Sequence, residues 1–130
     1  MELQTATVVA SGVDALYLSG AVETLPEGLV CALEDARQTA GRQGKSEPFT
    51  LGGVPMAVQP GPFGRYRFSL EHENARFGFT ESKHLPGVRV QFRARFLHAV
   101  GTELALEWLA LVASGAGIEP AWTVSRVDLF

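Results

Sequence analysis

Apolar and polar residues alternate most regularly between Val88 and Phe96. A period of two is typical of a β-strand with one buried face and one exposed face. The apolar positions of this strand are Val88, Val90, Phe92, Ala94 and Phe96. The polar positions between them are Arg89, Gln91, Arg93 and Arg95.

Shorter segments of the same kind recur along the chain. Their β-branched and aromatic residues, bounded by Gly, Pro and Asn, predict further strands. The segments are residues 5–10, 14–19, 54–58, 65–71, 75–80 and 122–130. The polar segment 42–47 is predicted to be a loop.

Two stretches have helical spacing instead. Thr24 and Glu27 have the spacing of a capping box, and apolar residues then recur every three or four positions until Gly41 and Gly44 end the helix. A second helix is predicted over residues 102–113, with Thr102 as its N-cap. Its predicted buried stripe is Leu104, Trp108, Leu111 and Val112.

Amphipathic strands of this kind are typical of an antiparallel sheet with one covered face and one solvated face. The order of elements predicts an α+β fold, a mostly antiparallel sheet of about six or seven strands with two helices packed on one face. Residues 1–130 form a single predicted domain, because no linker or repeat divides them. The other face of the sheet would then carry the arginines.

Composition is that of a globular chain, with 46% hydrophobic and 19% charged residues. No uninterrupted apolar run or signal pattern indicates a membrane partner, so a cytoplasmic location is expected. The single cysteine, Cys31, excludes an internal disulfide and is interpreted as a buried, inert thiol. The net charge of −3 conceals a basic middle: residues 65–95 carry seven basic and three acidic side chains.

This basic region predicts a surface that attracts a polyanion and contacts its phosphates. Alternate side chains on a strand lie about 6.6 Å apart, so the arginines of the clearest strand would form a straight row. The residues predicted to form this phosphate-binding face are Arg65, Arg67, Arg76, Arg89, Gln91, Arg93 and Arg95. The alternative is a solvated strand face whose arginines pair with nearby glutamates. Aromatic residues are not interleaved on this face, which argues against base stacking.

Asp128 is an acid among apolar residues on the last predicted strand. Arg126 shares its face, so an Arg–Asp pair on the open face of the sheet is one interpretation. The other is a metal-binding or catalytic carboxylate presented from the centre of the sheet. His72, between two glutamates, is interpreted either as a surface histidine or as an imidazolium or shared metal ligand.

Three short segments resemble replication initiation factors, the trans-acting rolling-circle initiators of plasmids and phages. They are Ser125–Phe130, Gly12–Ser19 and Val88–Arg93. The resemblance implies that Asp128 is a metal ligand, that the arginine face contacts DNA, and that the chain is the N-terminal part of a longer protein. A full-length initiator would use a divalent metal, whereas no cofactor is expected in this chain.

The chain departs from that family in three ways. It has no second acid after Asp128, no His-apolar-His motif and no tyrosine on a predicted helix. Strand cleavage needs such a tyrosine and a metal, so the chain is expected to be catalytically incomplete alone, and nicking-endonuclease-like only within a longer chain. The alternative function is a small phage or mobile-element protein whose sheet face binds a protein partner or forms a homodimer. A small-molecule enzyme would need a pocket of convergent polar groups, which the sequence does not indicate.

Overall fold

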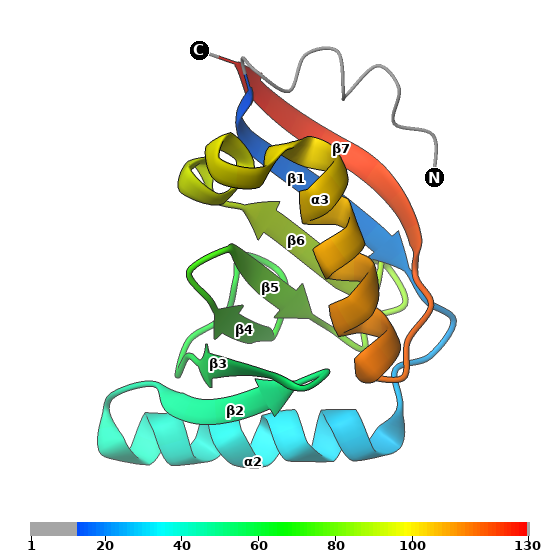
Figure 1. The fold of residues 1–130 in the computed structure, drawn as a ribbon. Helices are drawn as coiled ribbons and strands as arrows, with labels where there is room; N and C mark the ends of the chain where they lie inside the picture. The colour runs from blue at the N-terminus through cyan, green and yellow to red at the C-terminus, as the bar shows by residue number, and fades with distance from the viewer. Residues whose placement is uncertain (1–12, 130) are drawn as a thin grey trace.

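The computed structural model describes residues 13–129, which form seven strands and two helices (Figure 1). The predicted strand over residues 5–10 lies outside this range. The elements are β1 (Val13–Ala21), α2 (Glu27–Gln43), β2 (Glu47–Leu51), β3 (Val54–Val58), β4 (Phe68–Glu71), β5 (Ala75–Phe79), β6 (Val88–Phe92), α3 (Ala94–Gly115) and β7 (Ala121–Leu129).

The strands of the described chain form one antiparallel sheet in the order β2-β3-β4-β5-β6-β1-β7. The predicted α+β class is therefore confirmed. Successive hairpins account for the run from β2 to β6. The first strand, β1, then inserts between β6 and β7, so segments from opposite ends of the sequence lie side by side (Figure 1).

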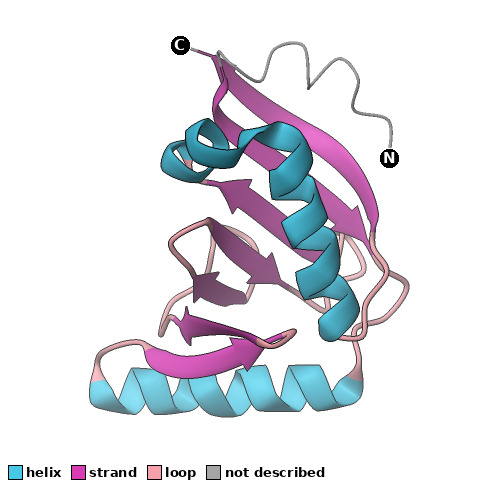
Figure 2. Cartoon of the chain, viewed as in Figure 1, coloured by secondary structure: helices cyan, strands magenta, loops and turns pink. Residues whose placement is uncertain are grey.

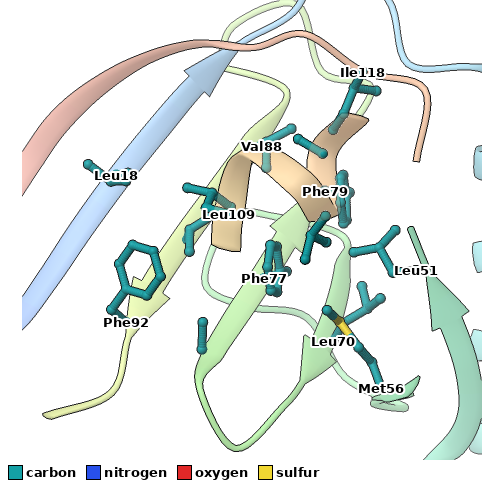
Figure 3. Packing of buried hydrophobic residues seen from close by; sticks show 14 of the residues in the cluster. Leu18, Leu51, Met56, Leu70, Phe77, Phe79, Val88, Phe92, Leu109 and Ile118 are labelled. Carbon is teal, nitrogen blue, oxygen red and sulfur yellow. The ribbon is translucent and has the colours of Figure 1, made fainter. Parts of the chain in front are cut away.

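One face of the sheet forms the core. Alternate residues of neighbouring strands stand opposite one another, as Phe77 does to Val90 and Leu70, and these side chains are at most 2% exposed. Figure 3 shows how the strand residues meet Leu109 of α3. Leu33 of α2 belongs to the same cluster, so both helices contribute to the core that this face forms. In Figure 2, α3 crosses the sheet while α2 runs along β2.

The first helix begins later than its sequence predicts. Its N-cap is Pro26, with no side-chain capping bond, so the predicted capping box of Thr24 is wrong. The C-terminal end is as predicted, since Gly44 adopts a left-handed φ of 68°. The predicted loop 42–47 also gives way to β2 at Glu47, because Phe49 and Leu51 pair with β3.

The second helix begins at Ala94, so the prediction of a strand that continues to Phe96 is wrong. Leu97 is buried in the core, at 2% exposure. In a strand that continued the alternation of β6, Leu97 would point to the opposite, open face. The backbone of Gly101 is non-helical, with a φ of 82°, so α3 consists of two helical segments that meet at a kink. The second segment begins at Thr102, close to the predicted start, and Thr102 is buried. Two of the predicted buried residues face outward, Leu104 at 55% and Leu111 at 72% exposure.

By length and composition alone, α3 is apolar enough to cross a membrane, with 22 residues and a hydropathy of 1.4. In the sequence, this apolar stretch was divided between a predicted strand that ended at Phe96 and a predicted helix that began at Thr102. A core helix has the same composition, and Leu106, Leu109 and Val112 pack against the sheet. Packing in the core accounts for part of this composition, because 39% of the apolar window is buried. The exposed large apolar side chains of α3 are Val100, Leu104 and Leu111.

Candidate functional site

The open face of the sheet carries a row of large polar side chains. Strand register places Arg76, Gln91, Tyr17 and Arg126 directly opposite one another across β5, β6, β1 and β7. Neighbouring strands lie about 4.8 Å apart, so three steps give the row a length of about 14 Å. The row unites β7 with strands that lie far from it in the sequence.

A second row runs beside the first and is made mostly of small residues. Gly78, Arg89, Ser19 and Thr123 stand opposite one another on the same four strands. Arg89 is the one long side chain among these four. Its guanidinium therefore has room to turn towards the rings on either side.

Aromatic rings alternate with the arginines of this face. The Cζ atom of Arg76 lies 4.0 Å from the ring centroid of Phe63, and that of Arg89 lies 4.7 Å from the same ring. Arg89 also lies 5.5 Å from the ring of Tyr17, and Arg126 lies 5.3 Å from it. These are cation–π distances. The inference that aromatic residues are not interleaved with the arginines is therefore wrong.

Phe63 reaches the open face because the β3–β4 connection, residues 59–67, folds over it. Phe63 and Tyr66 each donate a backbone hydrogen bond to the other's carbonyl, both 2.9 Å long. Their side chains are 6% and 5% exposed, and burial raises the pKa of the Tyr66 phenol. The two rings pack over Gly78, where an added Cβ would lie 2.9 Å from the Tyr66 Cβ and 3.1 Å from Phe63.

Replacement of Gly78 by valine is therefore expected to destabilise the fold by about 1–3 kcal/mol, the usual cost of overpacking. Valine favours strands, so a loss of stability would come from the contact with the loop. The measurement is the free energy of unfolding in urea. Gly61→Val is the control, since a Cβ at Gly61 meets nothing within 4 Å. Equal stability of both variants would contradict this account of the loop.

The charges of the face are only partly neutralised. Arg76 pairs with Glu71 at 3.1 Å, and Arg126 Nε donates to Asp128 Oδ1 at 2.7 Å. Arg89 has no carboxylate within ion-pair distance in residues 13–129; its near neighbours are the two rings. A guanidinium flanked by rings keeps its donors and its charge available for an anion.

The structure divides the seven predicted DNA-binding residues. Arg76, Arg89 and Gln91 share the open face, and Arg65 is exposed in the loop beside Tyr66. The straight row of four polar residues on one strand is wrong, because β6 ends at Phe92. Arg93 shares the Glu71 carboxylate with Arg76, whereas Arg67 and Arg95 lie away from the open-face row.

The side chains of Arg67, Arg93 and Arg95 have different environments. Arg67 forms an ion pair with Glu34 of α2. Arg93 occupies the N-cap position of α3 without a side-chain capping bond. Its Nε donates to the His72 carbonyl at 3.1 Å and its guanidinium pairs with Glu71, so Arg93 stabilises the β4–β5 turn. Arg95 is exposed in the first turn of α3. The helix start at Ala94 explains why Arg95 leaves the sheet face.

Sequence reasoning missed two residues that the site gains, Tyr17 and Phe63. Tyr17 lies in an alternating segment whose open-face parity was readable, but its neighbours depend on the strand order. Phe63 lies in a turn whose position over the sheet had no signal in the sequence. Arg126 was recognised as a partner for Asp128 but not as part of the arginine face.

Asp128 lies on β7, which is an edge strand of the sheet in the described chain, not at its centre. The prediction of a centrally placed acid is wrong because β1 separates β7 from β6. The Arg126–Asp128 pair on the open face is confirmed. Within residues 13–129, no group of three or more His, Cys, Asp or Glu side chains is arranged to hold a metal. A metal-binding role for Asp128 stays a prediction.

The ring of His72 is partly buried and packs against Trp108. Its Nδ1 accepts a hydrogen bond from the Asn74 amide at 2.9 Å, and its ring lies 5.2 Å from that of Trp108. Burial lowers the pKa of His72 below the usual 6.5, although the nearby Glu73 opposes this effect. The effect of burial on the pKa works against the imidazolium that the carboxylate neighbours would favour.

This lowered pKa predicts that stability falls with acid. The unfolded imidazole titrates near 6.5 and the folded one lower, so the unfolded chain binds more protons between the two values. The contribution is present above pH 6.5 and is lost as the pH falls through the folded pKa. We expect urea unfolding of the wild type to lose stability from about pH 8 to about pH 5, and His72→Gln to lose less. If the wild type and His72→Gln lost the same free energy of unfolding over this pH range, burial of His72 would not contribute to the pH dependence.

A separate cavity of about 580 Å³ lies between the β1–α2 connection, the first turns of α2 and the β5–β6 loop. Its lining includes Glu23, Glu27, Glu81 and Lys83, and none of the predicted site residues. Cys31 also lines it and is exposed, so the prediction of a buried thiol is wrong. The buried stripe of α2 is instead Leu33, Ala36 and Ala40.

Comparisons of the chain with protein families, with curated proteins and with solved structures each find no match. The geometry of the open face and the residues that form it are therefore what indicate a function.

Proposed function

We propose that the open face binds nucleic acid, with DNA as the ligand, as the N-terminal region of an initiator-like protein that is catalytically incomplete as this chain. The observation that carries the proposal is Arg89, a guanidinium between two aromatic rings without a carboxylate partner in residues 13–129. Ring faces hold the guanidinium in place without neutralising its charge. A guanidinium presents its N–H donors as a planar fork, and this geometry matches the oxygen atoms of a phosphate.

The neighbouring residues supply the rest of a contact surface. Arg76 and Arg126 extend the positive charge along the row to either side of Gln91 and Tyr17. Ser19 and Thr123 add hydroxyl groups next to Arg89, and hydroxyls are common partners of phosphate and sugar. Gln91 offers an amide that can bond to a base edge. The exposed Arg65 adds a further cation at the rim.

The resemblance to rolling-circle initiators agrees with this proposal, since the segments that carry it include β1, β6 and β7, three strands of the open face. We propose DNA strand cleavage only for a longer chain that contains this region. Tyr17 lies on β1 and Tyr66 in a loop, and neither is on a helix that would present a nucleophile. We therefore expect no nicking of DNA by the 130-residue chain with magnesium or manganese present.

Fluorescence anisotropy of labelled single- and double-stranded oligonucleotides tests the proposal. The titration is repeated at several salt concentrations. Neutralised phosphates release counterions, so the logarithm of the binding constant should fall linearly with the logarithm of salt. Contacts from the three arginines of the two rows, Arg76, Arg89 and Arg126, would give this plot a slope of about −2 to −3. An absence of binding at low salt would exclude nucleic acid as the ligand and leave a protein partner for the same face.

A further inference from the structure

We infer that β7 is the pairing edge for a second copy of this chain, with the two β7 strands antiparallel about a two-fold axis. The inference does not rest on the proposed nucleic-acid function. It begins from the position of β7, which lies at one margin of the sheet with β1 as its strand neighbour in the described chain (Figure 1). Its outer edge runs for nine residues.

The two margins of the sheet differ in how they are protected. The opposite margin, β2, has five residues, contains Pro48 and is covered by α2. Short length, proline and a covering helix are the usual means of keeping an edge strand from pairing. In contrast, β7 contains neither proline nor lysine, and seven of its nine residues are exposed. A long unprotected strand is a template for another strand.

The helix-side face of β7 is also apolar. Val124, Val127 and Leu129 stand opposite core positions of β1, yet they are 42%, 38% and 64% exposed. They make up half of the six exposed large hydrophobic side chains in the described chain. The other three lie on α3. A strand that paired with the outer edge of β7 would lower the exposure of these three side chains.

The pattern of β7 selects a second copy as the occupant, because the strand complements itself. With the two-fold axis at Val127, the antiparallel register sets Arg126 opposite Asp128 of the partner subunit. The same symmetry sets Asp128 opposite Arg126 of the partner subunit, so opposite charges meet twice on the open side. Opposite charges at directly paired positions favour a register. Val127 meets Val127 of the partner subunit at the axis, on the helix side.

Such pairing keeps both open faces on the same side of one continuous sheet, because directly opposed residues of antiparallel strands share a face. The two arginine rows would then form a single extended surface. A ligand longer than one row could contact both copies. The interface would leave Arg89 and Tyr17 uncovered, since they lie on strands inside each sheet.

Sedimentation equilibrium of the full chain over a wide range of concentrations tests the inference. We expect a monomer–dimer equilibrium. Val127→Lys places two ammonium groups at the axis and should raise the dimer dissociation constant by about tenfold or more. Leu111→Lys is the control, as it adds the same charge at an exposed position of α3 and should leave the constant unchanged.

A charge exchange separates pairing from misfolding. Arg126→Asp sets carboxylates opposite carboxylates and should weaken the dimer, whereas the double change Arg126→Asp with Asp128→Arg should restore it. A monomer at every concentration would overturn the inference. A dimer that Val127→Lys leaves intact, or that the double change does not restore, would do the same. Anisotropy on a monomeric variant then reports nucleic-acid binding separately.

Discussion

Replacement of Gly52 by alanine is expected to destabilise the fold by about 2–5 kcal/mol. Gly52 lies in the β2–β3 turn with a φ of 58°, where an alanine pays about 1–2 kcal/mol. A Cβ there would also lie 2.1 Å from the Val112 carbonyl oxygen of α3. Backbone atoms cannot turn aside as a flexible side chain can, so the hairpin and helix must separate. Chemical unfolding followed by tryptophan fluorescence measures the loss.

The adjacent Gly53 provides the matched control. Its φ is 82°, and a Cβ at this position meets nothing within 4 Å. Gly53→Ala should therefore cost only the conformational part, about 1–2 kcal/mol. The difference between the two variants isolates the contact with α3. If both variants lose the same stability, the close approach of turn and helix does not contribute.

Gly115 makes the same contact from the helix side. Its Cβ would lie 2.7 Å from the Gly52 carbonyl oxygen. Alanine usually favours a helix over glycine by about 1 kcal/mol, so the glycine at this position works against local propensity, and Gly115→Ala would gain propensity but lose this close contact. The two glycines thus let the end of α3 rest on the β2–β3 turn. This contact links the core over β6 and β1 with the hairpin that α2 covers.

The sequence predicted the fold class because the alternation of its strands is strong and local. Val88–Phe92, Ala75–Phe79 and Phe68–Glu71 all lie within predicted strands. The errors arose where two periods fit one segment. The alternation of β6 continues through Arg93–Phe96, but the same residues also fit the first turn of a helix, in which Phe96 and Leu97 both contact the core. Burial of Leu97 decides between the two. Packing overrides local pattern there.

The site was predicted less well than the fold, for a topological reason. A residue's face follows from its position on a strand, so Arg76, Arg89 and Gln91 were placed together correctly. Its neighbours follow from the strand order, and nothing local indicates that β1 separates β6 from β7. That insertion brings Tyr17 between Gln91 and Arg126. It also puts Asp128 near the sheet margin.

Replacement of Arg89 by glutamine is expected to weaken nucleic-acid binding about tenfold, which is about 1.4 kcal/mol. The guanidinium loses its charge and its fork of donors at the point where no carboxylate of the described chain competes for them. The slope of log binding constant against log salt should also become less negative by about one. Arg89→Lys keeps the charge but not the fork, so it should keep the slope and recover only part of the affinity.

Arg67→Gln is the matched control for this change. It removes the same charge from the chain, but from a guanidinium that pairs with Glu34 of α2. If the open face is the binding surface, Arg67→Gln should change the affinity and the slope much less than Arg89→Gln does. Equal effects would mean that binding follows net charge rather than the arrangement of the open face. The ring-flanked guanidinium would then be a packing device that holds the 59–67 loop on the sheet.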